Sequence, residues 1–162
     1  MLTIRAMTEA DADEVAAVSL SAYGTAGHFD ANGAYARTVA DVLGRVGHGE
    51  LLVAEDAGAI VGAVMLCHPD SALAEVSRPG EMEFRFLAVE PTQWRRGIGE
   101  ALVLTCHRRA RELGAHTMVI CVIDANLAAH RFYERPGYTR FPERDWQPHP
   151  GVMLLGFSSP LT

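Results

Sequence analysis

Apolar residues recur along the chain with two different periods, and these periods predict alternating strands and helices. Thr8 suits a helix N-cap and precedes a helical pattern, while Asp56-Ala57-Gly58 joins two β-rich runs in the manner of a hairpin. In chain order, we expect strand 2–5, helix 8–23, a turn-rich segment 24–33, helix 34–43, strands 51–55 and 60–67, a mobile loop 68–80, strand 81–89, helix 98–113, strand 117–122, helix 126–135, strand 138–141, a proline-rich loop 142–151 and strand 152–157.

This order of elements predicts an α/β fold with a partly antiparallel sheet and helices on both faces. The chain has 162 residues, which is a usual size for one domain with its own core, so we expect a single domain over 1–162. No internal repeat or low-complexity linker divides it.

The stretch from Gln93 to Gly99 connects the strand that ends at Val89 to the helix that begins at Ile98. The first amides of a helix have no partner within the helix and lie at the positive end of its dipole. Glycines at this point let an anion approach the backbone, and Arg95 and Arg96 add positive charge. The pattern therefore predicts that the turn binds a phosphorylated ligand.

The two glycines Gly97 and Gly99 alone are weak support, because a dinucleotide fingerprint needs a third glycine where this chain has Leu102. A nucleoside-triphosphate loop would need Gly-Lys-Ser/Thr, which is absent from the sequence. The arrangement of a strand, a turn and a helix in this order is the stronger support for a phosphate-binding site.

The amino-acid composition of the chain argues against some classes of protein function. The residues are 49% apolar and 21% charged, and no apolar run is long enough to span a membrane. Up to Thr92 there are 5 arginines against 14 acidic residues, a formal charge of −9, whereas the rest carries 9 against 6, or +3. The acidic part would repel nucleic acid and attract a cationic ligand. Three cysteines without a CxxC spacing, and no signal-peptide pattern, predict a cytoplasmic protein with reduced thiols.

A second motif follows the strand that ends at Val122: Asn126-x-x-Ala129-x-x-Phe132-Tyr133-x-x-x-Gly137-Tyr138. Together with the turn Arg96-Gly97-Ile98-Gly99, it resembles the GCN5-related N-acetyltransferase (GNAT) family, which transfers acetyl from acetyl-CoA to an amine. The resemblance implies the GNAT fold, with a mixed, mostly antiparallel central sheet flanked by helices on both faces. It also implies acetyl-CoA as co-substrate and no metal.

The resemblance also implies where the cofactor binds. The diphosphate of CoA would lie on the amides between Arg95 and Glu100, and the pantetheine arm would pair with the strand before the turn. A backbone N–H near Val89 would polarise the acetyl carbonyl. The family usually has Gln or Arg where this chain has Trp94, so that side chain could pack beside the adenine or on the surface. The implied cofactor residues are Leu87, Ala88, Val89, Trp94, Arg95, Arg96, Gly97, Ile98, Gly99, Glu100, Asn126, Ala129 and Tyr133.

Two residues are candidates for catalysis. The resemblance implies that Tyr133 protonates the departing thiolate and that Glu83 takes a proton from the amine, which must be neutral to attack a thioester. Arg85 lies on the same strand face as Glu83 and Glu81 and could pair with either acid, so a water-relayed base is the alternative. The alternative interpretations are that Tyr133 is a core residue, that Glu83 is an acid at an exposed strand end, and that Asn126 is a helix N-cap, either alone or in addition to binding pantetheine.

The acceptor is left open by the sequence. A small molecule or a peptide amine, but not nucleic acid or a membrane, is expected, and family members often form homodimers. In this fold Tyr23, Phe29 and Tyr35 would border the acceptor pocket. The histidines lack metal-ligand spacing, so a zinc site is not expected. A catalytically silent acyl-CoA-binding regulatory domain, transfer of a longer acyl group, and transfer to a hydroxyl are the alternative functions.

Overall fold

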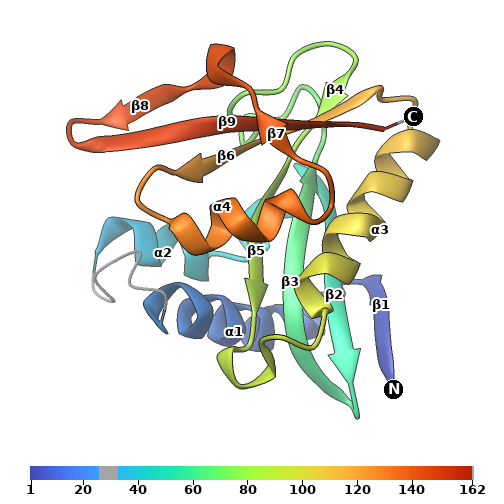
Figure 1. The fold of residues 1–162 in the computed structure, drawn as a ribbon. Helices are drawn as coiled ribbons and strands as arrows, with labels where there is room; N and C mark the ends of the chain where they lie inside the picture. The colour runs from blue at the N-terminus through green and yellow to red at the C-terminus, as the bar shows by residue number, and fades with distance from the viewer. Residues whose placement is uncertain (26–32, 162) are drawn as a thin grey trace. The chain divides into compact units, whose positions relative to one another are not determined.

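The computed structural model describes residues 1–25 and 33–161 (Figure 1). These residues form two compact units: Met1–Leu66 with Arg85–Thr105, and Cys67–Phe84 with Cys106–Thr162. Most of the predicted turn-rich segment 24–33, including Phe29, lies outside the described residues. The expectation of a single domain over 1–162 stays a prediction.

The first unit is built on a four-stranded sheet with the strand order β1-β2-β3-β5. Strands β1 and β2 pair antiparallel, with Leu2 opposite Asp56. The helix Ile98–Glu112 is divided between the units: its residues up to Thr105 belong to the first unit and those from Cys106 onward belong to the second. The elements are β1 (Leu2–Ala6), η1 (Glu9–Asp11), α1 (Ala12–Thr25), α2 (Ala34–Ala40), η2 (Leu43–Arg45), β2 (Gly49–Asp56), β3 (Ala59–Cys67), β5 (Phe84–Val89), η3 (Pro91–Gln93) and α3 (Ile98–Glu112).

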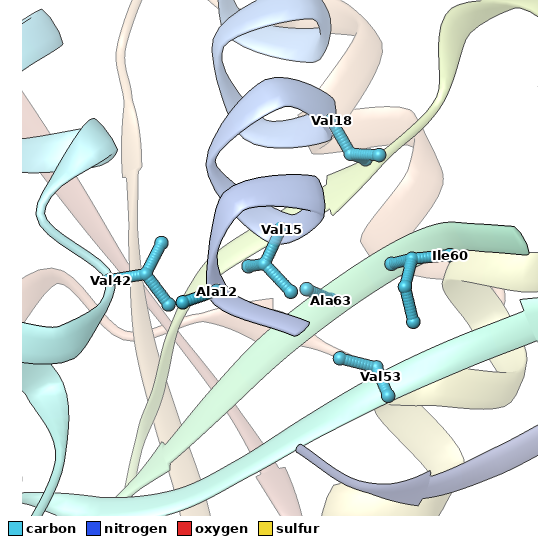
Figure 2. Close-up of a cluster of buried hydrophobic side chains, with 7 residues drawn as sticks. All are labelled: Ala12, Val15, Val18, Val42, Val53, Ile60 and Ala63. Carbon is cyan, nitrogen blue, oxygen red and sulfur yellow. The ribbon is translucent and has the colours of Figure 1, made fainter. Parts of the chain in front are cut away.

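Helices α1 and α3 cover opposite faces of β3. Val15 of α1 points toward Ala63 of β3 in a buried apolar cluster (Figure 2). A Cβ on the preceding residue, Gly62, would lie 3.1 Å from Leu102 Cδ1 and 3.2 Å from Ile98 Cγ2 of α3. Because consecutive residues of a strand point to opposite faces, one helix packs on each side. Glycine at this position lets α3 approach the strand closely.

The second unit contains a five-stranded sheet in which β9 is central. Strand β4 pairs parallel with β6, whereas β6, β7 and β8 all pair antiparallel with β9. A buried hydrogen bond of 2.7 Å joins His107 of α3 to the hydroxyl of Tyr138. The elements are β4 (Glu81–Met82), β6 (Thr117–Ile123), α4 (Leu127–Glu134), β7 (Thr139–Arg140), η4 (Pro142–Arg144), β8 (Trp146–His149) and β9 (Val152–Pro160).

The α/β prediction is confirmed, and three of the expected elements need correction. The single strand predicted at 81–89 is two strands in different sheets, with a break at Glu83. The predicted proline-rich loop 142–151 contains β8, an edge strand that tolerates Pro148 because it pairs on one side only. Helix 34–43 ends at Ala40 and is followed by a 3₁₀ turn. Residues 68–80 form no helix or strand, as expected.

Among the described residues, no helix is long and apolar enough to span a membrane. In the same part of the chain, no group of three or more His, Cys, Asp or Glu side chains could hold a metal ion.

Candidate active site

The turn between β5 and α3 contains two residues in the left-handed backbone region. Gly97 has φ 79° and Arg95 has φ 69°, both in the left-handed region. The helix begins at Ile98, and the amide of Ala101 donates to the carbonyl of Gly97 at 3.0 Å. The amides before Ala101 therefore have no acceptor within the helix.

The two arginines of this turn differ in their surroundings. Arg96 donates to Gln93 and forms an ion pair of 3.1 Å with Asp56 at the end of β2. Arg95 is exposed, and within the described residues of the first unit it has no ion-pair partner. Arg96 thus ties the turn to the neighbouring hairpin, whereas Arg95 is the more available of the two cations.

The side chain of Trp94 is hydrogen-bonded to the last residue of β5. Its indole Nε1 donates a hydrogen bond of 2.8 Å to the carbonyl oxygen of Val89, while 45% of the residue is exposed to solvent. Of the strand residues expected to meet the cofactor, Ala88 is buried, and Leu87 and Val89 are half-buried. Trp94, which stands where the family usually has Gln or Arg, is therefore hydrogen-bonded to the protein's own backbone.

Phe86 interrupts the regular geometry of β5. It has φ 59°, a left-handed conformation that is strained for a bulky side chain. Such a residue costs on the order of 1–3 kcal/mol, and residues of this kind gather at functional sites. It directly precedes Leu87, the first of the expected cofactor-binding residues. No local pattern in the sequence indicates this conformation, because the residue is not a glycine.

Tyr133 projects from α4 into an aromatic cluster of the second unit. Its ring centroid lies 6.1 Å from that of Phe84, 5.0 Å from that of Phe132 and 5.4 Å from that of Tyr138. Only 8% of the residue is exposed, and burial raises the pKa of its hydroxyl above the ordinary value. Among the described residues of the second unit, none forms a hydrogen bond with that hydroxyl. The group is protonated at neutral pH and can donate a proton or a hydrogen bond.

Asn126 is the N-cap of α4, as one of the two sequence interpretations expected. Its Oδ1 accepts a hydrogen bond of 3.2 Å from the amide of Ala129. This contact stabilises the start of the helix and orients both residues of the motif.

Glu83 is not at an exposed strand end, and that expectation is wrong. Only 1% of the residue is exposed. Its Oε1 accepts three hydrogen bonds from the amides of Glu75, Val76 and Ser77, at 2.9, 2.9 and 2.8 Å. The carboxylate therefore anchors the loop before β4. Glu83 itself lies in neither β4 nor β5, at the break between the two strands.

Glu81 has a partner that the sequence did not suggest. Arg144 of η4 donates to both of its carboxylate oxygens, at 2.5 and 2.9 Å, and also to the carbonyl of Val76 at 2.9 Å. Burial by itself would raise the pKa of Glu81, but the hydrogen bonds from Arg144 and from the amide of Arg78 lower it below its ordinary value. Because 63 positions separate the two partners, no local pattern could have paired them.

The structure groups the expected site residues within each unit. The first unit holds the strand and turn residues Leu87, Ala88, Val89, Trp94, Arg95, Arg96, Gly97, Ile98, Gly99 and Glu100. The second unit holds Glu83, Asn126, Ala129 and Tyr133. Sequence reasoning overlooked Phe86, and it overlooked Arg45, which follows the end of a predicted helix and gave no signal of being buried.

Residues 20–138 match the sequence profile of the acetyltransferase (GNAT) family. An acetyltransferase of the GNAT family from Staphylococcus aureus Mu50 has 15% identity to this chain, with 100% of both chains covered and a TM-score of 0.78. The ribosomal-protein-S18-alanine N-acetyltransferase from Escherichia coli has 18% identity over 100% of this chain and 95% of that one, with a TM-score of 0.74. No curated protein sequence matches the chain.

A third similar structure was determined with a ligand. The PaiA N-acetyltransferase from Thermoplasma acidophilum, in complex with coenzyme A, has 15% identity over 96% of this chain and 98% of that one, with a TM-score of 0.72. At these identities the structures share the fold, and the expectation of a GNAT fold is confirmed.

Proposed function

Because the chain belongs to the GNAT acetyltransferase family, we propose that it transfers the acetyl group of acetyl-CoA to a primary amine of a small molecule or peptide. The observation that carries this proposal is the turn before α3, where Arg95 and Gly97 both have positive φ. It combines the first amides of a helix, which have no acceptor within the helix, with a helix dipole and exposed positive charge in one place.

The diphosphate of CoA would lie on the backbone amides between Arg95 and Glu100. Gly97 supports this placement because a Cβ added there would meet no heavy atom within 4 Å, so the space beside it is open for a ligand. Arg95 would supply charge to the phosphates, whereas Arg96 would hold the turn through Asp56. The Trp94 side chain would stabilise the adjoining strand end rather than bind phosphate.

The pantetheine arm would run along the backbone of Leu87, Ala88 and Val89. A backbone amide near Val89 would donate to the acetyl carbonyl and stabilise the negative charge of the tetrahedral intermediate. In the second unit, Asn126, which caps α4 through its Oδ1, would hydrogen-bond the pantetheine. Ala129, in the first turn of that helix, is small enough to let the cofactor approach.

Tyr133 would assist the departure of the CoA thiolate. The hydroxyl is protonated at neutral pH because burial raises its pKa, so the donor is present when the carbon–sulfur bond breaks. The raised pKa also weakens the hydroxyl as an acid. The balance favours a strong hydrogen bond to the developing thiolate, with proton transfer completed as the negative charge on sulfur grows.

Deprotonation of the acceptor would involve Glu83 through water. Direct contact with the amine is disfavoured, because the side chain is 1% exposed and Oε1 is engaged by three amides. A water molecule on Oε2 could carry the proton from the amine to the carboxylate. The structural role of Glu83 and this relay are compatible, because they use different oxygen atoms.

The proposal is tested by isothermal titration calorimetry with CoA and by thiol release from acetyl-CoA with a panel of amines. We expect binding of CoA and release of thiol that depends on the amine. Binding of CoA without turnover on any amine would favour the catalytically silent regulatory domain. Faster turnover with a longer acyl-CoA, or with an alcohol as acceptor, would favour those alternatives.

We further propose that the chain works as a single cytoplasmic domain without a metal. Its three cysteines support the cytoplasmic location, because none of them forms a disulfide bond and Cys67 and Cys106 are buried.

A further inference from the structure

The turn before α3 contains a left-handed residue that is not a glycine. Arg95 has φ 69° and lies two positions before Gly97, which has φ 79°. A left-handed conformation is unfavourable for an arginine, which has a Cβ, and it persists only where the surrounding contacts hold it. The contacts beside Arg95 therefore determine whether the turn keeps its shape.

The residue that follows Arg95 is held by two side-chain contacts. Nη1 of Arg96 donates to Oε1 of Gln93, and Nη2 donates to Oδ2 of Asp56 at 3.1 Å. Gln93 belongs to the same stretch of chain as the turn, whereas Asp56 lies 40 positions before Arg96, at the end of β2. The contact with Gln93 keeps the turn compact, and the contact with Asp56 fixes the turn to the hairpin between β2 and β3.

The carboxylate of Asp56 is itself held in place. Its second oxygen, Oδ1, accepts a hydrogen bond of 3.1 Å from the amino group of Met1. The hydrogen bonds from Met1 and Arg96 lower the pKa of Asp56 below its ordinary value, so the group carries its charge at neutral pH. All three residues belong to the first unit.

The ion pair of Asp56 and Arg96 matters more to the turn than to the overall stability. The side chain of Asp56 is 19% exposed and that of Arg96 is 49% exposed, and ion pairs at a surface contribute little to the free energy of unfolding. Arg96, however, stands between the two left-handed residues of the turn. A change in the position of Arg96 therefore changes the backbone where an alternative, extended conformation is most favourable.

A carboxylate beside a phosphate site has two opposite effects. Its charge repels the phosphates, while its contact with Arg96 keeps the turn in the conformation that presents the backbone amides. The repulsion is reduced here because Asp56 is already paired with two cationic groups. We therefore expect the effect on the conformation of the turn to be the larger one.

We propose that Asp56 is a positioning residue of the cofactor site: by holding Arg96, it keeps the turn in the conformation that receives the diphosphate. This inference rests on the proposed function. It adds the hairpin between β2 and β3 to the parts of the chain on which cofactor affinity depends, and it assigns Asp56 a role that needs no contact with the cofactor.

The test is a double-mutant cycle read out as the Kd for CoA in titration calorimetry. Asp56→Ala should raise the Kd roughly threefold to tenfold, and Arg96→Ala should raise it at least as much. The variant with both changes should bind no more weakly than Arg96→Ala alone, because Asp56 acts through Arg96. In a thiol-release assay, the effect of Asp56→Ala should appear in KM for acetyl-CoA rather than in kcat.

Glu55→Ala is the matched control. Glu55 is the neighbouring residue of β2, so its side chain points to the opposite face of the sheet, where it forms an ion pair of 3.3 Å with Arg5. The control removes the same charge and a similar ion pair next to Asp56 without touching the turn. We expect similar melting temperatures for Asp56→Ala and Glu55→Ala, and an increased Kd for CoA in Asp56→Ala alone.

Three results would overturn the proposal: an unchanged Kd in Asp56→Ala, tighter binding in that variant, which would show that repulsion dominates, or an equal effect of Asp56→Ala with and without Arg96. These results also differ from a failure of the proposed function. If the unmodified protein binds CoA but Asp56→Ala and Glu55→Ala have the same Kd, only the positioning role is wrong. If the unmodified protein does not bind CoA, the proposed function itself fails.

Discussion

The indole nitrogen of Trp94 is hydrogen-bonded to the backbone carbonyl of Val89 at 2.8 Å, across the turn from β5 to α3. This contact joins the end of the strand to the start of the proposed diphosphate turn. The sequence analysis predicted that both residues bind the cofactor, and the structure shows a hydrogen bond between the two. The position of the turn relative to the strand is thereby maintained by a side chain where the family usually has Gln or Arg.

Replacing Trp94 by Phe should weaken CoA binding a few-fold. The variant keeps an aromatic ring but loses one hydrogen bond, worth about 1 kcal/mol, that positions the turn. Titration calorimetry with CoA measures the effect. Trp146→Phe is the control, because Trp146 lies on β8 in the other unit and is similarly exposed, at 37% against 45%. Identical affinities of the two variants would remove Trp94 from cofactor positioning.

Gly97→Val should abolish CoA binding. A branched side chain would occupy the open space beside the glycine, and the φ of 79° is strained for any L-residue. Gly114→Val is the matched control, because Gly114 at the other end of α3 also has a left-handed φ, 91°, with open space around it. Both variants should lose stability in thermal unfolding, but only Gly97→Val should lose CoA. Retained affinity in Gly97→Val would refute the diphosphate site.

Tyr133→Phe should reduce kcat on the order of tenfold to a thousandfold and leave the Kd for CoA nearly unchanged, as expected when a general acid is lost. A steady-state assay of thiol release measures kcat, and titration calorimetry measures the Kd for CoA. Tyr138→Phe is the control, because it removes a second buried hydroxyl, which bonds to His107 at 2.7 Å, from the same aromatic cluster. Similar kcat values for both variants would show that Tyr133 is a packing residue.

Glu83→Gln should move the pH–rate profile to higher pH, because a neutral amide cannot accept the proton and more of the amine must already be deprotonated. The amide oxygen can still accept the hydrogen bonds from Glu75, Val76 and Ser77, so the variant should fold. Glu81→Gln is the control: it leaves buried Arg144 without its anion and should lower the melting temperature without moving the profile. An unmoved profile in Glu83→Gln would identify another base.

His107 should make the stability of the protein decrease at mildly acidic pH. Burial lowers the pKa of His107 below its ordinary value, so the unfolded chain takes up a proton that the folded chain does not. Above about pH 6.5, the pKa of histidine in the unfolded chain, this group therefore does not reduce the free energy of unfolding. As the pH falls below that value, the free energy of unfolding decreases. Melting temperatures measured between pH 8 and pH 5 should decrease less for His107→Gln than for the unmodified protein, whereas His149→Gln, an exposed control, should behave like the unmodified protein. Identical pH dependence in His107→Gln and the unmodified protein would show that another group is responsible.

The features that depend only on residues close in sequence could be predicted from the sequence. The turn from Arg95 to Gly99, the start of α3 at Ile98 and the N-cap at Asn126 depend on contacts within about four positions. Two such motifs at the right separation were also sufficient to indicate the family, which the profile match then confirmed. The predicted strand through Glu83 failed because alternation describes one strand in one sheet and cannot reveal where a chain leaves one sheet for another.

The sequence alone determined most of the helices and strands and the place of the glycine-containing turn before α3, because hydrogen bonding within a helix and alternation along a strand are local. The tertiary structure decided which charges are buried and with what partners. Arg144 pairs with Glu81 from 63 positions away, and Arg45 reaches Phe86 of β5 from η2. A side chain's cost of burial depends on every element packed around it, and only the folded chain brings those elements together.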